Sequence, residues 1–441
     1  MSKTIIIIGA GLAGLSAALQ AAENGCNVKL VSSFPSERAQ SVMAEGGINA
    51  ALNTKDENDS PEEHFTDTIK AACGLADPNA VWGMTQAAPE LVHWLLKLGV
   101  KFNMSGYDDV DLRNFGGQKK KRTAFAQSDT GKQIMTAMID AVRRKEASGM
   151  VERFSHHSFL TLRLCGNICC GCVIRDEYSQ ETVELPGDAV IVATGGMHGL
   201  FGNTTGSLSN TGEVTAELFR LGVPLANGEM IQYHPTTVKC GGKRMLISEA
   251  ARGEGGRLFA MKDGKQWYFM EEKYPELGNL MPRDITAREI WKVSHESEVF
   301  LDMTEISEEI ISNKLSGLAD DCMTYLHKDI RKEPVSVLPG IHYFMGGILV
   351  DEQHRTPIQN LYAAGECCAQ YHGANRLGGN SLLGALYGGR VAAKSACEQA
   401  DVVDLSCATQ IDFPPASQIS EIKQLNKVMQ ETMGAVSYTH L

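Results

Sequence analysis

A glycine-rich turn that directly follows a β-branched run constrains this chain more than any other feature. Residues 4–8, rich in Ile, predict a strand buried on both faces of a parallel sheet. The turn that follows is Gly9-x-Gly11-x-x-Gly14. Residues 15–24 then predict a helix closed by Gly25, and residues 27–32 predict a second strand. Together these segments predict a β-α-β unit.

Each glycine of the turn has a separate task in such a unit. Gly9 permits the tight turn, Gly11 leaves room for a pyrophosphate at the helix N-terminus, and Gly14 allows close packing of helix on strand. The turn therefore predicts a dinucleotide site. Where NAD sites place an acidic residue on the ribose, this chain has Val31-Ser32-Ser33, which favours FAD over NAD. No second GxGxxG follows a strand, so we expect electrons from another protein or a small donor.

Two later segments predict further strands of the same sheet. Residues 189–193 end in Thr194-Gly195-Gly196 and residues 360–364 end in Gly365-Glu366, so both deliver glycine-rich ends to one edge. Between them, over about residues 229–340, Met and charged residues become more frequent, and residues 305–330 predict a helix. We interpret this stretch as an inserted lobe.

Helix starts and the end of the chain carry structural signals only. Capping boxes at Ser60 with Glu63 and at Asn210 with Glu213 predict two helix starts. After Pro414-Pro415, an amphipathic helix is predicted from Ser417, with its apolar face formed by Ile419, Ile422, Leu425 and Val428. The last five residues break the helical pattern, so we expect a truncated helical domain with a foreign tail.

Charge and cysteine spacing exclude several classes of protein. The 441 residues carry a formal net charge of −12, which is unfavourable for binding a nucleic-acid backbone. The basic run Lys119 to Arg122 is predicted to be a solvated loop. No apolar run reaches the ~18 residues of a membrane span, and the start lacks a signal peptide, so we expect a cytoplasmic protein. The cysteines from Cys165 to Cys172 flank a turn and lack a second cluster of matching spacing, which predicts a hairpin and no metal site.

Six further motifs occur in order along the chain. They are Ala44-Glu45-Gly46-Gly47-Ile48, Gln232-Tyr233-His234-Pro235-Thr236, Ser248 to Gly256, Pro282-Arg283-Asp284, His342 to Gly347 and His372 to Leu382. Together they closely resemble the flavoprotein subunits of succinate dehydrogenase and fumarate reductase, and the resemblance extends from residue 4 to about residue 397.

The resemblance implies an α/β fold with a dicarboxylate pocket at a domain junction. A Rossmann-like FAD-binding domain would be built from residues 1–228 and 341–400, with an α+β capping domain inserted at 229–340. Residues 401–441 would be a linker and the first helix of a truncated helical domain.

The resemblance also implies roles for particular residues. His342 and Arg376 would bind one carboxylate of fumarate, and His234 and Ser248 the other, with Ser248 where relatives often have Thr. Phe125 would line the pocket beside the flavin. Independently of the family, Arg is the best bidentate partner for a carboxylate. The residues implied to bind FAD are Gly9, Gly11, Gly14, Ser32, Gly46, Gly47, Thr194, Gly195, Glu366, Asn380, Ser381 and Leu382.

For catalysis, the resemblance implies hydride transfer from flavin N5 and proton donation by Arg283, resupplied through Glu249 and Arg252. The residue type alone would suggest that Arg283 is a substrate clamp, because a guanidinium rarely releases its proton. Both readings remain open from the sequence.

Gln40 departs from the pattern of the membrane-bound relatives, which attach FAD covalently through a His at the aligned position. Gln cannot form that bond, so we expect non-covalent FAD. Because the covalent bond accompanies a higher flavin potential in the family, fumarate reduction is favoured over succinate oxidation. The alternatives are L-aspartate oxidase, another flavin-dependent unsaturated-acid reductase, and, in a different class, an inert FAD-loaded electron-transfer component.

Partners follow from the same resemblance. We expect a small dicarboxylate substrate and, as in relatives that form complexes, an iron–sulfur subunit or another electron donor. Neither nucleic-acid binding nor membrane insertion of this chain is expected, although partner subunits could hold it at the cytoplasmic membrane. The isolated residues His64, His93 and His327 are interpreted as surface or satisfied core side chains without a role.

Overall fold

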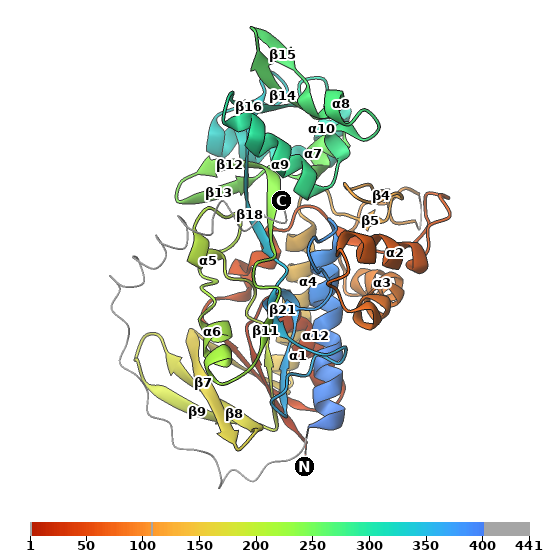
Figure 1. Cartoon of the computed structure of the whole chain (residues 1–441). Helices are drawn as coiled ribbons and strands as arrows, with labels where there is room; N and C mark the ends of the chain where they lie inside the picture. Colours follow the sequence, from red (N-terminus) through yellow and green to blue (C-terminus); the bar gives the residue numbers. More distant parts are fainter. Residues whose placement is uncertain (1, 107–108, 401–441) are drawn as a thin grey trace.

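A parallel sheet forms the centre of the computed structural model, which describes residues 2–106 and 109–400 (Figure 1). Five strands stand in the order β20-β10-β1-β2-β6, and all neighbours are parallel. The strands are β1 Thr4–Ile8, β2 Asn27–Ser32, β6 Val151–Ser155, β10 Ala189–Val192 and β20 Leu361–Ala363. Ile8 pairs with both Val31 and Val192. The carboxyl ends of β1, β2 and β10 therefore meet at one edge, as the sequence predicts.

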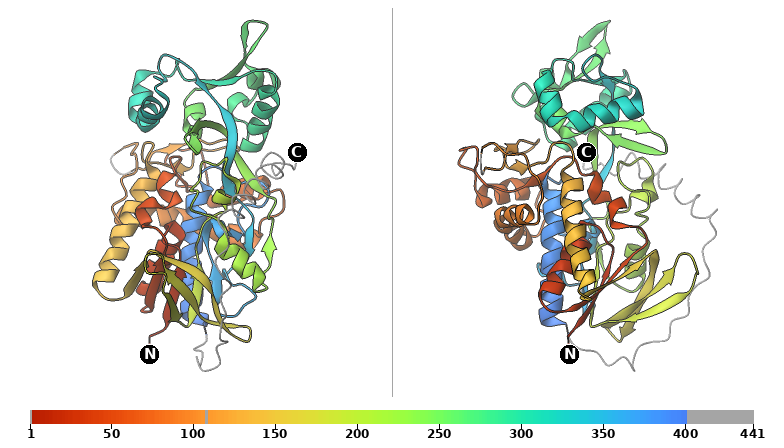
Figure 2. Two further views of the ribbon diagram at one scale, coloured as in Figure 1. Left: turned by 90° about the vertical axis from the view of Figure 1, so that its left-hand side faces the viewer. Right: turned by 180° about the vertical axis from the view of Figure 1, so that it is seen from behind.

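Helices from both ends of the chain pack together beside this sheet (Figures 1 and 2). Helix α1 contacts both α12 and α4. The buried side chains of Ile5, Leu15, Ile134 and Leu386 belong to one hydrophobic cluster, so the beginning and the end of the described chain share a core. The helices of this part are α1 Leu12–Glu23, α2 Pro61–Ala71, α3 Pro78–Lys97, α4 Thr130–Ala147 and α12 Asn380–Gln399.

Two predicted helix starts have different outcomes. The Ser60 hydroxyl accepts a hydrogen bond from the Glu63 amide at 3.2 Å and caps α2, which confirms that start. Helix α6, Glu213–Arg220, instead follows Gly212, and no side chain caps it, so the capping role predicted for Asn210 is wrong. Gly212 has a positive φ of 78°, which turns the chain before Asn210 can reach the helix.

A three-stranded antiparallel sheet adjoins the parallel one. It contains β7 His157–Cys165, β8 Ile168–Asp176 and β9 Thr182–Pro186, which confirms the predicted hairpin. Cys169 and Cys172 are buried in a cluster with Ile6 and Val190. Smaller elements are β3 Ile48–Asn49, β4 Leu112–Arg113, β5 Thr123–Ala124, α5 His198–Phe201, β11 Leu225–Ala226, β19 Gly347–Leu349, β21 Cys368–Ala369 and the 3₁₀ turns Ser36–Arg38, Gln40–Met43 and Gly365–Cys367.

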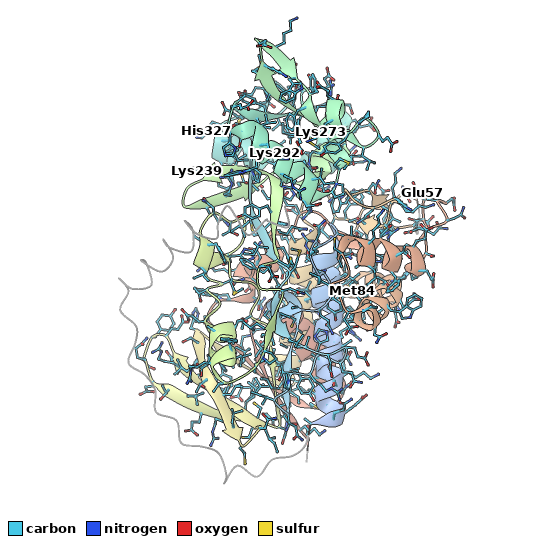
Figure 3. All side chains as sticks on the ribbon, in the orientation of Figure 1. Glu57, Met84, Lys239, Lys273, Lys292 and His327 are labelled. Atoms are coloured by element: carbon cyan, nitrogen blue, oxygen red, sulfur yellow. The ribbon has the colours of Figure 1, made fainter. Side chains whose placement is uncertain are left out.

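The chain between β12 and β18 forms a separate lobe, here called the cap lobe, at the top of Figure 1. Strands β12 Ile231–Cys240 and β18 Leu338–Phe344 pair side by side, and β13 Lys243–Leu246 pairs with β12. A hydrophobic cluster of its own lies wholly between Ile247 and Val337. Lys273 and Lys292 of this lobe and Lys239 of β12 are exposed, and Figure 3 labels all three. Its other elements are α7 Glu249–Gly253, β14 Arg257–Lys262, β15 Lys265–Trp267, α8 Phe269–Lys273, the 3₁₀ turn Gly278–Leu280, α9 Arg283–Ser294, β16 Val299–Asp302 and β17 Val335–Ser336.

The helix predicted over residues 305–330 is interrupted. The structure has α10 Glu308–Lys314, α11 Ser316–Asp321 and a π turn Cys322–Leu326 that ends at His327. Leu315 separates the first two pieces with a φ of −126°, outside the helical range, and its side chain is buried in the cluster of the cap lobe. Burial of Leu315 therefore overrides the local helical pattern.

Arg122 corrects the prediction of a solvated basic loop. Lys119 and Lys121 are exposed, but Arg122 is fully buried and its Nη2 lies 2.8 Å from Asp59 and 3.0 Å from Asp67. Both partners come from a segment more than fifty residues earlier in the sequence, so the local pattern could not reveal them.

Among residues 2–106 and 109–400, no helix is both long and apolar enough to span a membrane. The helix predicted from Ser417 lies outside the described residues.

Candidate active site

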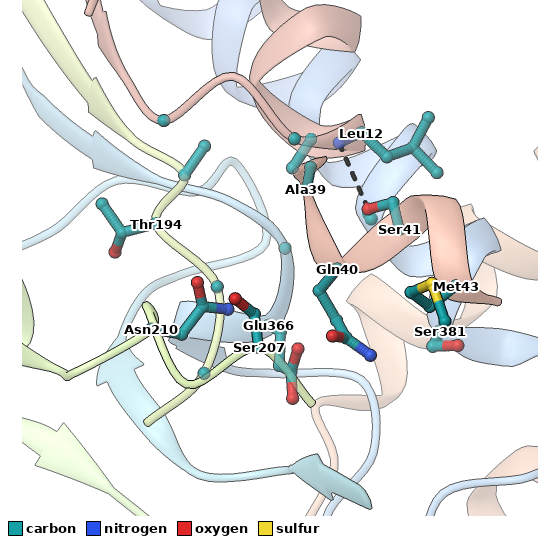
Figure 4. Close-up of a pocket in the computed structure, with 18 of the residues that line it drawn as sticks. Leu12, Ala39, Gln40, Ser41, Met43, Thr194, Ser207, Asn210, Glu366 and Ser381 are labelled. Atoms are coloured by element: carbon teal, nitrogen blue, oxygen red, sulfur yellow. Dashed lines mark hydrogen bonds between the residues drawn. The ribbon is translucent and has the colours of Figure 1, made fainter. Parts of the chain in front are cut away.

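One cavity of about 520 Å³ lies at the carboxyl edge of the parallel sheet, and Figure 4 shows part of its lining there. The cavity extends to the cap lobe, where Ser248, Glu249 and Arg283 line it. It brings together most of the predicted site residues. Those that line it are Gly9, Gly11, Ser32, Gly46, Gly47, Thr194, Gly195, His234, Ser248, Glu249, Arg283, His342, Glu366, Arg376, Ser381 and Leu382. Gly14, Phe125, Arg252 and Asn380 are not part of its lining.

The glycine-rich turn has the shape that a pyrophosphate needs. A Cβ on Gly9 would lie 2.2 Å from the Ala193 carbonyl oxygen, and one on Gly14 would lie 1.8 Å from the Gly9 oxygen. These two glycines therefore permit close backbone packing. A Cβ on Gly11, the N-cap of α1, would meet nothing closer than 3.7 Å, and Gly11 faces the cavity. The open space beside a helix N-terminus fits an anionic group.

Ser32 and Glu366 each bring a polar group to the cavity, Ser32 from the end of β2 and Glu366 from the turn after β20. The Ser32 Oγ is buried and has no hydrogen-bond partner within the described part of the chain. One oxygen of Glu366, Oε1, accepts from His198 Nε2 at 3.0 Å and from the Phe344 amide at 3.0 Å, which fixes the carboxylate. A buried hydroxyl without a partner and a fixed carboxylate in the lining fit a ligand that carries several hydroxyl groups.

Gln40 and the Glu45-Gly46-Gly47 segment form another part of the cavity wall. Figure 4 shows Gln40 in the 3₁₀ turn Gln40–Met43, directed into the cavity. The buried Arg113 donates to the carbonyl oxygens of Glu45, at 3.0 Å, and of Gly46, at 2.9 Å. These bonds hold the glycines against the cavity, and the wall as a whole fits FAD.

Two histidines face the part of the cavity beneath the cap lobe. His234 on β12 and His342 on β18 have ring centroids 5.1 Å apart. His342 Nδ1 is 2.8 Å from the Thr205 hydroxyl, whereas His234 Nε2 is buried without a partner among the described residues. Burial lowers the pKa of both rings well below the usual 6.5, and the charge of Arg283 lowers it further. Both histidines are therefore neutral hydrogen-bonding groups at neutral pH.

Arg283, Glu249 and Arg252 form a buried chain of charges. Arg283, the first residue of α9, points both Nε and Nη2 at Glu249 Oε2, each at 2.7 Å. Glu249 Oε1 accepts from the Gly116 amide at 2.8 Å and lies 3.8 Å from Arg252 Nη2. Burial alone would raise the pKa of Glu249, but the two guanidinium groups lower it below its usual value. The carboxylate is therefore ionised and connects the two arginines.

Arg376 approaches the same cavity from the loop before α12. Its Nη2 donates to Gln232 Oε1 at 2.9 Å, and its guanidinium lies 4.6 Å from the centre of the Tyr343 ring. Burial and the nearby charge of Arg283 lower the pKa of Arg376 to about 9. Arg283 Nη1 also donates to Gln232 Oε1, at 3.2 Å, so one amide oxygen bridges two guanidinium groups.

Sequence reasoning missed three residues of this site. Gln232 belongs to a quoted motif and Tyr343 follows His342, so both could have been found there. Phe115, and not Phe125, lines the cavity. Phe125 is 1% exposed. The guanidinium carbon of Arg113 lies over the Phe125 ring, 4.3 Å from the ring centre. The placement predicted for Phe125 is therefore corrected.

The chain is similar to known flavoproteins over most of its length. A family model described as "FAD binding domain" matches residues 4–382. The chain is 44% identical to the succinate dehydrogenase flavoprotein subunit of Bacillus subtilis, over 92% of this chain and 70% of that protein. It is 33% identical to the L-aspartate oxidase of Streptomyces coelicolor, over 95% of this chain and 73% of that protein. A solved structure of a quinol fumarate reductase FrdA mutant from E. coli superposes with a TM-score of 0.86 at 29% identity, covering 98% of this chain and 74% of that one.

Proposed function

This chain belongs to the FAD binding domain family, among the flavoproteins of succinate dehydrogenase and fumarate reductase, and on that premise we propose that it reduces fumarate to succinate. Its class, an FAD-dependent oxidoreductase, follows from the family. The dicarboxylate, the direction of the reaction and the residue roles are our proposal.

The observation that carries the proposal is the convergence of Arg283 and Arg376 on one buried cavity beside two neutral histidines. Buried cations need anions near them, and Glu249 is the ionised carboxylate that pairs with Arg283. A dicarboxylate would supply the further negative charge. His342 with Arg376 would bind one carboxylate, and His234 with Ser248 the other.

The charge chain supports Arg283 as the proton donor. Because Nε and Nη2 both point at Glu249, the guanidinium is held in one orientation, and Glu249 can accept and return a proton. Arg252 lies on the other side of Glu249, away from the cavity lining, which suits a relay position. FAD, when bound, supplies the hydride equivalent.

Gln40 supports non-covalent FAD and reduction as the preferred direction. It occupies the cavity wall with a side chain that cannot form the bond of a linking histidine. We further propose that an iron–sulfur subunit or another carrier delivers electrons and that partner subunits can hold the chain at the cytoplasmic membrane. The relative from Wolinella succinogenes, an 8-methylmenaquinol:fumarate reductase flavoprotein subunit with 32% identity, is by its name one subunit of a larger enzyme, which supports a partner that delivers electrons.

L-aspartate oxidase is the second candidate, because the Streptomyces coelicolor enzyme matches nearly the whole chain. One comparison separates the candidates. The FAD-loaded protein is offered fumarate with reduced viologen, succinate with an oxidised dye, and L-aspartate with the same dye. We expect viologen oxidation by fumarate to be fastest. A faster reaction with L-aspartate would overturn the proposal, and no turnover with any of the three would indicate an inert electron-transfer component.

A further inference from the structure

The N-terminal turn of α12 borders the cavity through Gly379, Ser381 and Leu382, but Asn380 between them does not. The side chain of Asn380 is fully buried on the opposite side. Its Oδ1 lies 2.7 Å from Asn49 Nδ2 and 2.9 Å from His64 Nε2, and its Nδ2 lies 3.0 Å from the Thr68 hydroxyl. A part of the cofactor wall is therefore fixed from behind by polar contacts.

The hydrogen-bond directions in this network can be worked out from Thr68. Its hydroxyl donates its only proton to the His64 carbonyl oxygen at 2.8 Å, so towards Asn380 it can only accept. The Asn380 atom facing Thr68 is then the NH₂ group, and the atom facing His64 is the carbonyl oxygen. His64 must therefore donate from Nε2.

His64 is held in that state by its surroundings. Burial and the charge of Arg122 together lower the pKa of His64 to about 3, so the ring is neutral at neutral pH. Arg122 pairs with Asp67 at 3.0 Å, one residue before Thr68 on α2. The Nε2–H donor therefore sits on a helix that is itself anchored.

A second contact shows how little room the turn has to move. Asn49 donates from Nδ2 to the Gly378 carbonyl oxygen at 2.8 Å. A Cβ on Gly379 would lie 2.1 Å from Asn49 Oδ1. Gly378 and Gly379, which precede α12, therefore pack closely against Asn49, a member of the hydrogen-bond network around Asn380.

We propose that His64 is a positioning residue for FAD, which acts through Asn380 to fix the first turn of α12 in the cavity wall. The free amides at a helix N-terminus carry partial positive charge, so their orientation affects how strongly an adjacent electron-rich group is held. Removing the His64 donor takes away one of the three contacts that hold the Asn380 side chain and loosens this turn. The inference rests on FAD binding in this cavity and not on the identity of the substrate.

The test compares His64→Leu with His64→Gln, in which the amide nitrogen can reach the place of Nε2. His93→Leu is the matched control, because His93 is an exposed histidine on the neighbouring α3. Three quantities are measured without substrate: the FAD dissociation constant on dilution of the loaded protein, its visible absorption spectrum, and the midpoint potential of the bound flavin.

We expect His64→Leu to bind FAD ~10-fold more weakly, as the loss of one buried hydrogen bond implies, with an altered spectrum and potential. His64→Gln should recover most of this loss, and His93→Leu should match the wild type. A folded His64→Leu protein with wild-type values for all three would overturn the proposal. If His64→Leu does not fold, Thr68→Val decides in the same way, because it removes the acceptor of the Asn380 NH₂ group.

Discussion

The guanidinium of Arg376 is held in place before any substrate arrives. Gln232 accepts from Nη2, the Leu377 carbonyl oxygen accepts from Nη1, and the Tyr343 ring covers one face. Nε remains buried without a partner among the described residues. Because the Arg376 guanidinium is already oriented, binding of a carboxylate does not require a further loss of side-chain entropy.

Arg376→Ala should remove this preformed partner and lower kcat/KM for fumarate by about 10²- to 10³-fold, the usual loss when one member of a buried charged pair is truncated. FAD should remain bound, because Arg376 approaches the cavity on the side of His342. Steady-state kinetics and the flavin spectrum check both points. An unchanged kcat/KM would show that Arg376 has only a structural role.

Arg283→Lys separates proton donation from charge. Lys keeps the positive charge but cannot reproduce the double contact of Nε and Nη2 with Glu249. If Arg283 donates the proton, kcat at saturating fumarate should fall at least ~10²-fold. Lys292→Arg, at an exposed position of the same helix, is the control. Retention of most of kcat with a raised KM would show that Arg283 is a clamp.

The low pKa of Arg376 predicts a pH limit for substrate binding. Burial and Arg283 lower this pKa to about 9, so the guanidinium is charged below that pH and loses its charge above it. The KM for fumarate should be steady near neutral pH and should rise once the pH passes about 9. The FAD dissociation constant, measured over the same range, controls for unfolding. A KM that stays level well above that pH would contradict this origin of the affinity.

Residue types were easier to predict than side-chain directions. The resemblance named His234, His342 and Arg376, and all three line the cavity. It named Phe125, whereas Phe115 lines the cavity. Both rings contact Arg113, and only the packing of the whole loop determines which ring faces inwards. His64 gave no signal, since its partner Asn380 lies more than three hundred residues away.

At the scale of elements, a methyl group added at the first turn of α1 should have one of two effects: a clash with the protein backbone at Gly14, or an obstruction of the cofactor space at Gly11. Gly14→Ala would place Cβ within 1.8 Å of the Gly9 oxygen, so it should destabilise the fold by about 1–3 kcal/mol or more. Gly11→Ala meets no protein atom within 3.7 Å and should keep the wild-type Tm of the apoprotein but weaken FAD binding. Thermal unfolding with and without FAD distinguishes them. Equal Tm losses in both apoproteins would contradict this division.

Elements were predictable where burial and local pattern agree. The β-branched runs of β1 and β10 are buried on both faces, and the strands form as expected. The segment around Leu315 could not be predicted, because a core of distant residues, including Ile247 and Val299, draws this side chain inwards and interrupts the helix. Local propensity yields to tertiary burial there.

At the scale of the whole molecule, FAD should be bound firmly but without a covalent bond. The basis is Gln40 in the wall of an otherwise complete cavity. Acid precipitation of the protein should release the yellow colour into the supernatant. Flavin fluorescence that remains on the chain in a denaturing gel would contradict the prediction.

The side-by-side pairing of β12 and β18 means that the cap lobe leaves and re-enters the FAD-binding part at a single place. Ser248 and Arg283 lie inside that excursion, and Arg376 lies outside it. His234 and His342 lie on the two paired strands themselves. The lobe is thus joined to the rest of the chain through one pair of neighbouring strands. A lobe from a related chain could replace it without a change in the connections of the other elements. An exchange of this kind would replace Ser248 and Arg283 together and leave Arg376 unchanged. New substrate preferences could therefore arise by recombination as well as by point mutation.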